Sequence, residues 1–314
     1  MKTPLVSIIT VNYNTPEVTA AMLRSLTLLD YDNWEVIVVD NASPQYSSLP
    51  LIKEFPFIKH ISAPTNIGFA GGNNIGLHFA KGDYILFLNN DTIVKPNLLT
   101  VLVNYLQIHP ECGMACPKIK YFELPDTIQY AGTIGLHPLT SRSHNIGFLQ
   151  KDNGQFNKSE QTDLPNGAAM MIPALLIKKI GAMSEMFFLY YEELDWAERF
   201  KKAHYQIHYV GTTEILHKES ISTGKNSPLK IFYLYRNRLL FIRRNYTGWK
   251  YIIASSFFTF ISTPVHIIKH AINMEWKLSR SIINAFIWNL RHQPFKEPKI
   301  HSSTFVQQLS PDTL

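Results

Sequence analysis

The chain has 314 residues, of which 46% are hydrophobic, 12% aromatic and 17% charged. This composition supports a buried core, so it excludes an intrinsically disordered chain and a collagen-like fibre. Only two cysteines are present, Cys112 and Cys116. Two cysteines exclude a disulfide-stapled scaffold and a cysteine-based zinc site, and they favour a reduced, cytosolic setting.

The positive charge is concentrated in one segment. The net charge is +6, and ten of the 30 Lys and Arg residues lie between Lys225 and Arg280, with one of the 24 acidic residues. The amino-terminal apolar run is short and interrupted by Ser7, so we expect no secretory signal. We also find no stretch of about 20 apolar residues, so we expect no membrane-spanning helix.

The first hundred residues alternate strand and helix patterns. Apolar runs at 6–11, 34–39 and 84–88 predict buried parallel strands. Thr15, followed by a proline, predicts the start and cap of a helix. The glycine-rich stretch after Asn66 leads into another helix. This order predicts a mostly parallel sheet with right-handed crossovers.

The rest of the chain is less regular. Residues 120–165 lack periodicity and predict a loop-rich region beside the site. The later predicted elements are a strand at 166–172, a helix at 192–203, two strands at 205–210 and 214–217, and helices after Pro228.

Polar residues follow each of the three predicted parallel strands. Ligands bind beyond the carboxyl ends of strands in such sheets, so this convergence predicts a binding site. The residues are Asn12, Tyr13 and Asn14; Asp40 and Asn41; and Asn89, Asn90 and Asp91.

Two of these features have a structural alternative. Asp91 suits Mg²⁺ or Mn²⁺, which bind through one or two carboxylates plus substrate phosphates, but an acid in this place is more often a turn residue, and so is Asp40. The glycines between Asn66 and Gly76 let backbone N–H groups approach an anion, although a tight turn explains them equally well. The stretch matches neither a Walker A loop nor a dinucleotide fingerprint.

Three acids fall in the first turn of a predicted helix: Glu192, Glu193 and Asp195. The helix dipole stabilises negative charge there, and Asp195 is spaced to pair with Arg199. An acid beside the aromatic residues at 187–191 also suits a general base. His217 ends an apolar strand and is a candidate metal ligand, although a lone histidine is more often structural.

Together these segments resemble a family 2 glycosyltransferase of the GT-A fold, in the branch of bacterial rhamnosyltransferases. The resemblance rests on VSIITVNYN at 6–14, VVDNAS at 38–43, NIGFAGGNNIG at 66–76, LNNDT at 88–92 and FFLYYEELDWAERF at 187–200. It implies an α/β fold with a mostly parallel central sheet flanked by helices and a Rossmann-like nucleotide-binding half. The implied domains are a nucleotide-sugar-binding half at 1–118, an acceptor-binding half at 119–225, and a helical, basic region at 226–314.

The resemblance also implies a role for each site residue. Asp40 would hydrogen-bond the base of a nucleotide-sugar, and Asp91 would bind a divalent cation, Mn²⁺ or Mg²⁺. His217 would be a further metal ligand, because Asn89 stands where the family's DxD-type motif has its first acid. Glu193 aligns with the catalytic base, with Glu192 and Asp195 as alternates. The other residues implied at the nucleotide-sugar are Val11, Tyr13, Asn41, Gly71, Gly72, Asn74, Asn89 and Asn90.

The implied activity is inverting, metal-dependent transfer from a nucleotide-sugar, dTDP-rhamnose or else a UDP-sugar. The acceptor would be a hydroxyl of a polysaccharide or lipid-linked glycan in bacterial cell-surface synthesis. The alternative is a catalytically silent, nucleotide-sugar-binding scaffold of a polysaccharide assembly complex, since Asn89 and Glu193 depart from the family's acidic motifs. A sugar-phosphate nucleotidyltransferase would need a glycine-rich start with an arginine, which this chain lacks.

The basic carboxyl-terminal part contains an apolar run of about thirteen residues, Tyr251 to Thr263, which ends before Pro264. That length suits a core or interfacial helix better than a membrane span. With Arg243, Arg244 and Lys250 beside it, the run favours an amphipathic anchor on an anionic membrane within 225–280. A helix packed on the catalytic domain with a solvated basic face is the alternative. No nucleic-acid-binding module is present. We therefore expect a cytoplasmic protein, peripheral on the cytoplasmic face of the inner membrane.

Overall fold

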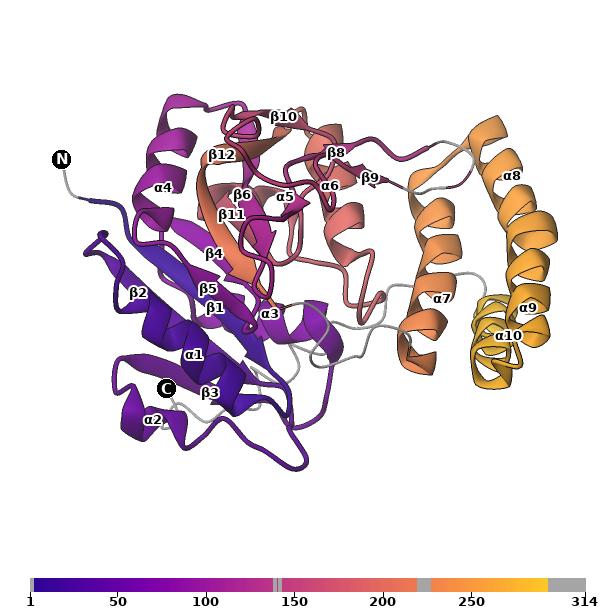
Figure 1. Cartoon of the computed structure of the whole chain (residues 1–314), viewed down its shortest axis with the longest axis horizontal. Coiled ribbons are helices and arrows are strands. Elements are labelled where there is room, and N and C mark those ends of the chain that lie inside the picture. Colours follow the sequence, from indigo (N-terminus) through magenta and orange to yellow (C-terminus); the bar gives the residue numbers. More distant parts are fainter. Residues whose placement is uncertain (1–2, 138–139, 141–142, 219–226, 293–314) are drawn as a thin grey trace.

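The computed structural model describes residues 3–137, 140, 143–218 and 227–292 (Figure 1). A 10-stranded mixed sheet forms the centre, in the order β10-β12-β6-β11-β4-β1-β2-β3, with β5 paired to β12 and β7 to β6. The strands of this sheet are β1 (Val6–Asn12), β2 (Trp34–Asp40), β3 (Ile58–Ser62), β4 (Tyr84–Leu88), β5 (Thr92–Val94), β6 (Cys112–Tyr121), β7 (Ile128–Tyr130), β10 (Glu160–Thr162), β11 (Ala169–Pro173) and β12 (Gln206–His217). A separate small ribbon consists of β8 (Thr133–Ile134) and β9 (His144–Asn145).

The helices in the described part of the chain lie between these strands and after them. They are α1 (Pro16–Leu26), α2 (Leu51–Glu54), α3 (Gly68–Phe79), α4 (Leu98–Ile108), α5 (Ala174–Ile180), α6 (Glu192–Lys202), α7 (Pro228–Asn245), α8 (Gly248–Phe257), the π-helical turn η1 (Phe258–Ser262), α9 (Thr263–Ile272) and α10 (Trp276–Arg291).

The amino-terminal half of the sheet is parallel, which confirms the predicted strands at 6–11, 34–39 and 84–88. Strand β1 pairs in parallel with both β2 and β4, and β2 pairs in parallel with β3. In this register Asn12 lies opposite Asp40, and Ile9 lies opposite Phe87. The polar residues that follow the three strands therefore share one edge of the sheet.

The other half of the sheet differs from the prediction in one place. The two strands expected at 205–210 and 214–217 form one strand, β12, which runs parallel to β6 with an irregularity between Val210 and Glu214. A Cβ atom on Gly211 would lie 2.4 Å from the carbonyl oxygen of Phe156. The residues Gly-Thr-Thr therefore form a bulge where another segment approaches closely, rather than a break between two strands.

Helix α3 packs closely on the sheet because of its glycines. A Cβ atom on Gly76 would lie 2.4 Å from Cγ2 of Ile9, and one on Gly72 would lie 2.9 Å from Cγ1 of Val11. On Gly71 it would meet the side chain of Ile67 at 2.8 Å. The packing of the helix thus accounts for glycine at these positions, a reason beyond both the anion cradle and the tight turn that the sequence suggested.

The carboxyl-terminal helices stand together at one end of the molecule, away from β2 and β3 (Figure 1). Segments α8, η1 and α9 form one helix of 25 residues, Gly248–Ile272, with a mean hydropathy of 1.5 over an 18-residue window, long and apolar enough to cross a membrane. The expectation that Pro264 ends this run was therefore wrong. Proline removes one backbone N–H, and the π-helical turn directly before it accommodates that loss without ending the helix. The predicted domain boundary at 225/226 lies outside the described residues.

We predict that Gly76→Ala destabilises the protein. The clash with Ile9, worth roughly 1–3 kcal/mol, opposes the gain of about 1 kcal/mol that alanine brings to a helix, and we expect the clash to prevail. The measurement is the free energy of unfolding in urea. His78→Ala, at an exposed position of the same helix, is the control and should change it by less than about 0.5 kcal/mol. An increase in stability in Gly76→Ala would show that α3 is not held this close to β1.

Candidate functional site

The pairing of β5 with β12 brings Asp91 and His217 together. Thr92 lies opposite His217 in this antiparallel pair, and the backbone N–H of Lys218 donates to the carbonyl of Asp91 at 2.9 Å. Both side chains are buried, and Nε2 of His217 lies 3.1 Å from Oδ1 of Asp91. The predicted metal-binding residues, far apart in sequence, are therefore neighbours.

The state of the imidazole follows from its other nitrogen. Nδ1 of His217 lies 2.8 Å from Oε1 of Gln129. Because an amide oxygen can only accept, Nδ1 carries a proton, and Nε2 is the nitrogen that faces Asp91. Among the described residues, Oδ1 of Asp91 receives no well-aligned hydrogen bond, in spite of its short distance to the histidine.

This arrangement fits a shared divalent cation. Two ligand atoms that each lie about 2.1 Å from an octahedral ion at a right angle are about 3 Å apart, close to the separation of Nε2 and Oδ1. Ligands of one cation point at the cation rather than at each other, which explains the poor hydrogen-bond alignment. The contact with Gln129 fixes the tautomer, as second partners of metal-binding histidines commonly do. In the described part of the chain no cluster of three or more His, Cys, Asp or Glu residues could hold a metal ion, so phosphate oxygens of a substrate would have to complete the coordination.

A buried polar network supports the edge next to Asp91. The amide of Asn90 donates to the hydroxyls of Thr15 and Thr19 at 2.8 and 2.9 Å. Thr19 in turn donates to Asn12 at 2.9 Å, and Asn12 donates to Ser43 at 3.2 Å. This chain of bonds joins the ends of β1 and β4 to α1. Thr15 precedes the helix as predicted, but it accepts from Asn90 and makes no side-chain cap bond.

Asp40 holds the loop that follows β2. Its Oδ1 accepts from the N–H of Ser43 at 2.9 Å, and its Oδ2 accepts from the N–H and hydroxyl of Ser48 and the hydroxyl of Ser47. Burial raises the pKa of Asp40, but the hydrogen bonds from Ser48 and Ser43 outweigh it and lower the pKa below its usual value. Asp40 is therefore an ionised carboxylate at the predicted edge, although its bonds in this structure are to its own loop.

The two asparagines predicted at the nucleotide-sugar besides Asn89 and Asn90 also hold loops. The amide of Asn41 donates to Asn66 and to the carbonyl of Gly68, each at 3.0 Å. The amide of Asn74 donates to the carbonyl of Met183 and to Glu185, each at 2.9 Å. These bonds join the carboxyl edge to the segment before α6. Val11, Tyr13 and Asn89 remain partly accessible at this edge.

The two glutamates at the start of α6 differ in accessibility. Glu192 is buried, whereas part of Glu193 remains accessible, with its Oε2 buried and without a hydrogen-bond partner in the described residues. Burial and the neighbouring Glu193 raise the pKa of Glu192 well above its usual value. Burial also raises the pKa of Glu193, to about 7, against hydrogen bonds from the backbone of Glu193 and Tyr191. Glu193 is thus the accessible member of the pair and can exchange a proton near neutral pH.

Asp195 has a structural role, which argues against it as an alternate base. Its Oδ1 accepts from Nε of Arg244 at 3.0 Å and from the amide of Asn245 at 2.9 Å, and its Oδ2 lies 3.4 Å from Nε of Arg199. The predicted pair with Arg199 is therefore present. Because both oxygens are engaged by α6 and α7, the carboxylate anchors one helix to the other.

The aromatic segment before α6 has a strained backbone. Phe188, Tyr190 and Tyr191 have φ values of +63°, +68° and +77°. Such conformations cost roughly 1–3 kcal/mol each for residues other than glycine and cluster at functional sites. Gly68, at φ +77°, makes room for this segment, since a Cβ atom there would lie only 2.1 Å from the carbonyl oxygen of Phe188.

Helix α7 holds the strained segment through two buried side chains that the sequence analysis missed. The amide of Asn237 contacts the carbonyl oxygens of residues 187, 189 and 190, each at 2.8 Å. Arg236 donates to the carbonyls of Met186 and Phe187 at 2.6 Å. No local pattern distinguished this Arg-Asn pair from the rest of the basic segment. Arg243 and Arg244, predicted to face an anionic membrane, bond instead to Asn289 and Asp195 within the protein.

Glu193 lies near the same edge as Asp91. A Cβ atom on Gly167 would be 3.9 Å from Cδ of Glu193. The next residue, Ala168, accepts a hydrogen bond from the N–H of Asn89 at 2.9 Å. The segment at 166–168 therefore runs between the general-base candidate and the Asn89-Asn90-Asp91 turn.

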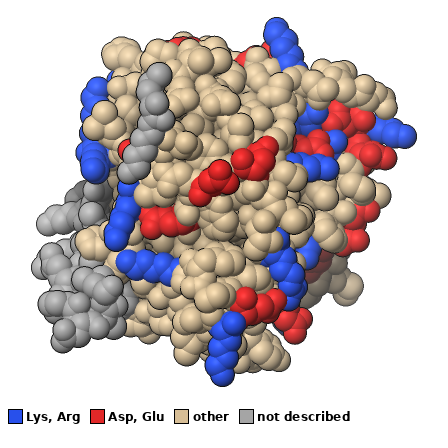
Figure 2. Space-filling model, turned by 90° about the vertical axis from the view of Figure 1, so that its left-hand side faces the viewer, with Lys and Arg blue, Asp and Glu red and all other residues tan. Residues whose placement is uncertain are grey.

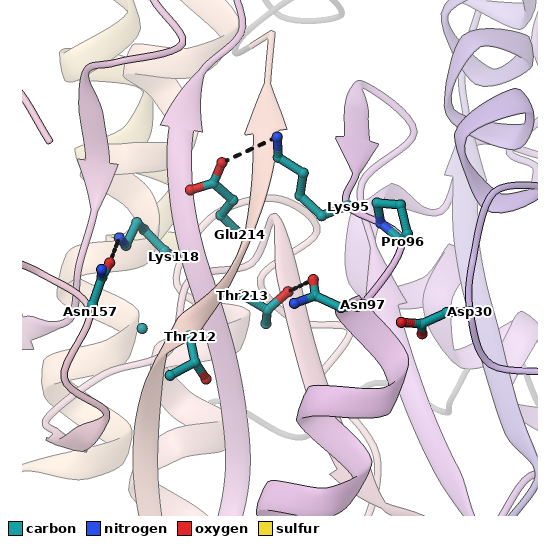
Figure 3. A pocket seen from close by; sticks show the side chains of 10 residues that line it. Asp30, Lys95, Pro96, Asn97, Lys118, Asn157, Thr212, Thr213 and Glu214 are labelled. Carbon is teal, nitrogen blue, oxygen red and sulfur yellow. Dashed lines mark hydrogen bonds and ion pairs between the residues drawn. The ribbon is translucent and has the colours of Figure 1, made fainter. Parts of the chain in front are cut away.

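A polar cavity lies at the other end of the β5–β12 pair (Figure 3). It measures about 530 Å³ and is lined by residues 95–97 between β5 and α4, by Lys118 of β6, by residues 211–214 of β12, and by Asp30 and Asn157. Its polar side chains bond mainly to one another: Lys118 to Asn157, Lys95 to Glu214, and Asn97 to Thr213. These contacts make the cavity a poor match for a separate substrate, and it contains neither Asp91 nor Glu193.

Comparison with known proteins gives one family. The family model described as "Glycosyl transferase family 2" matches residues 7–175. The low-salt glycan biosynthesis hexosyltransferase Agl10 of Haloferax volcanii is 26% identical over 240 residues, which cover 74% of each chain. An N-acetylglucosaminyl-diphospho-decaprenol L-rhamnosyltransferase of Mycobacterium tuberculosis is 19% identical over 273 residues, 79% of this chain and 87% of that one.

The fold is similar to that of a solved enzyme. The mannosyltransferase PcManGT of Pyrobaculum calidifontis, in complex with GDP-Man and Mn²⁺, has a TM-score of 0.57 at 12% identity, over 93% of this chain and 89% of that one. The chain therefore has the predicted GT-A fold, with a mostly parallel central sheet and helices at its carboxyl-terminal end.

We predict that Asn237→Ala loosens the segment at 187–191. The substitution leaves buried carbonyl groups without their donor, which costs roughly 1–3 kcal/mol. The free energy of unfolding in urea should fall by that amount. Relative to the unaltered protein, amide hydrogen exchange should become faster in 187–191 than in the rest of the variant. Asn284→Ala, at an exposed position of α10, is the control. Unchanged exchange in 187–191 would mean that α7 does not hold this segment.

Proposed function

The chain belongs to glycosyl transferase family 2, and we propose that it is an inverting, metal-dependent enzyme that moves a sugar from a nucleotide-sugar to a hydroxyl group. The observation that carries this proposal is the buried pair of Asp91 and His217, whose facing atoms lie 3.1 Å apart without a well-aligned hydrogen bond. A ligand set of one carboxylate and one imidazole at the carboxyl edge of a parallel sheet suits a cation that also contacts a diphosphate.

The donor would lie along the edge formed by the ends of β1, β2 and β4. We propose that 1–118 holds the nucleotide-sugar and 119–225 the acceptor. Val11, Tyr13 and Asn89 are accessible to a ligand there, and the backbone at Gly71 and Gly72 would border its nucleotide. Asp40 would hydrogen-bond the base through Oδ1, which accepts one bond from the N–H of Ser43 within its own loop. The donor is dTDP-rhamnose, by analogy with the rhamnosyltransferase relative, or else a UDP-sugar.

Asp91 and His217 would hold Mn²⁺ or Mg²⁺, which when bound would neutralise the charge that develops on the diphosphate as it leaves. A neighbour of this fold was solved with Mn²⁺. Gln129 contacts Nδ1 of His217 and so leaves Nε2 facing Asp91, and Asn90 secures the turn that carries Asp91.

Glu193 is proposed as the general base. Its carboxylate takes the proton of the acceptor hydroxyl while the hydroxyl oxygen bonds to the anomeric carbon. The bond from that carbon to the diphosphate oxygen breaks on the opposite face, so the nucleoside diphosphate leaves and the configuration inverts. Glu192 stays protonated beside it, because a second negative charge at this buried site is unfavourable. Asp195 and Asn237 position α6 and the segment before it.

The acceptor would be a hydroxyl of a polysaccharide or of a lipid-linked glycan, met at the cytoplasmic face of the membrane. A catalytically silent scaffold that binds nucleotide-sugars remains the alternative of a different class. The two are separated by donor turnover: a protein that binds donor with a cation but neither hydrolyses nor transfers the sugar would be the scaffold.

Glu193→Gln should lower kcat roughly 10²–10⁴-fold, since general-base catalysis contributes about that much, while leaving nucleotide-sugar binding unchanged. The kcat is measured with the donor and a panel of acceptor hydroxyls, and nucleotide-sugar binding is measured by calorimetry. In the unaltered protein the rate should rise with pH around a midpoint of about 7, because the raised pKa leaves Glu193 protonated and inactive at lower pH.

Glu198→Gln, a partly accessible glutamate of the same helix, is the matched control and should keep full activity. Retained turnover in Glu193→Gln, together with its loss in a folded Asp195→Asn protein, would reassign the base.

Asp91→Asn and His217→Ala should abolish the extra thermal stabilisation that Mn²⁺ gives to the protein in the presence of UDP, GDP or dTDP, since a ligand that binds the native state raises its melting temperature. Gln129→Leu should raise the Mn²⁺ concentration needed for this stabilisation about 10–100-fold. Asp32→Asn, an exposed carboxylate, is the control. A full Mn²⁺ effect in both Asp91→Asn and His217→Ala would remove these residues from the cation site.

A further inference from the structure

The outer face of the long helix Gly248–Ile272 is apolar and exposed. Only 17% of its apolar 18-residue window is buried in the described structure. Phe260 is 76% exposed and Ile272 is 74% exposed. We call this surface the outer apolar face; its residues are Trp249, Ile252, Ile253, Phe260, Ile261, Val265, Ile268 and Ile272. Most of these residues recur at intervals of three, four or seven residues, which places them on one side of the helix.

The opposite side of the same helix packs against α7. Ala254 and Phe258 are buried in a cluster with Leu239 and Ile242 of α7. Ser262 and Thr263 continue this buried side toward α9. Figure 1 shows the helix lying along α7 at the edge of the molecule. The helix therefore packs on one side and presents the other side outward, as an interfacial helix does.

The charges beside the outer apolar face have one sign. Within the described residues 246–292 the exposed cations are Lys250, Lys269, Lys277, Arg280 and Arg291, and Glu275 is the one acid. That acid is engaged within the protein, since its Oε2 lies 2.7 Å from Nδ1 of His270. The opposite flank of the molecule differs, because Figure 2 shows Lys and Arg interspersed there with Asp and Glu. Two exposed tryptophans, Trp249 and Trp276, stand near the two ends of the apolar helix, a position that tryptophan favours at membrane interfaces.

We propose that the outer apolar face docks this protein on the surface of a bilayer that contains anionic lipid, with Gly248–Ile272 lying in the plane of the interface. The apolar side chains would enter the acyl boundary, and the flanking lysines and arginines would meet anionic headgroups. A second copy of the chain is a poorer occupant, because a contact between two such faces would bring clusters of positive charge together.

Docking would also orient the candidate site. The side of α7 that packs on Ala254 and Phe258 carries Leu239 and Ile242, while Arg236 and Asn237 of the same helix hold the segment before Glu193. One rigid helix therefore joins the outer apolar face to the loop of the general-base candidate. The docking itself does not depend on the proposed transfer reaction, so it can be tested without donor or acceptor.

The experiment is vesicle flotation of the full chain without nucleotide. Vesicles of phosphatidylcholine with 30% phosphatidylglycerol should bind it, on the order of tenfold more strongly than phosphatidylcholine alone. Phe260→Glu combined with Ile268→Glu should lower binding at least about tenfold, because both side chains would leave the acyl boundary. Ile108→Glu, at a 72% exposed position of α4, which lies far from the carboxyl-terminal helices (Figure 1), should bind like the unaltered protein.

Circular dichroism melting distinguishes lost docking from misfolding, since both glutamates replace exposed side chains and should leave the melting temperature unchanged. Equal binding by the double variant and the unaltered protein would overturn the proposal, as would equal binding to neutral and anionic vesicles. A lipid-free dimer that the double variant dissociates, with no binding to vesicles, would assign the face to a second copy. Vesicle binding that appears only in a protein ending at residue 292 would assign it to the chain's own terminal segment.

Discussion

The buried side-chain amide of Asn237 and guanidinium of Arg236 hold the carbonyl groups of residues 186, 187, 189 and 190. These contacts are made at the turn where three aromatic residues have positive φ values. Backbone polar groups buried without partners are costly, and so are these conformations, so the segment keeps its shape only while α7 supplies the donors. Glu193 follows directly after this segment, so its position depends on that contact. The same helix, α7, also anchors Asp195 through Arg244 and packs against the apolar helix through Leu239 and Ile242.

The environments of the three acids at the start of α6 separate their roles. Asp195 is held by Arg244, Asn245 and Arg199, which keeps it as a structural carboxylate. Glu192 is buried next to another acid, which favours its protonated form. Glu193 has an accessible side and a pKa raised to about 7. The three acids thus differ in charge state and role because Glu192 and Asp195 are buried, whereas part of Glu193 remains accessible.

The paired strands β5 and β12 position the two candidate metal ligands. Their register sets His217 beside Asp91, and Gln129 on β7 selects the histidine's tautomer. The network through Asn90, Thr19 and Asn12 secures the turn that carries Asp91 from the side of α1. Three separate parts of the chain therefore meet at Asp91. Because they are distant in sequence, the local sequence around Asp91 does not reveal its partners.

The sequence by itself determined the parallel half of the sheet and the family. The runs at 6–11, 34–39 and 84–88 are buried on both faces, and local hydrophobicity and turn residues suffice to define such strands. The tertiary structure alone decided that Arg243 and Arg244 bond inside the protein, that β12 is a single bulged strand, and that Pro264 lies within a helix of 25 residues. It also distinguished Glu193 from its acidic neighbours. Strand and helix patterns arise from neighbours in sequence, whereas the burial, pairing and pKa of a side chain arise from neighbours in space.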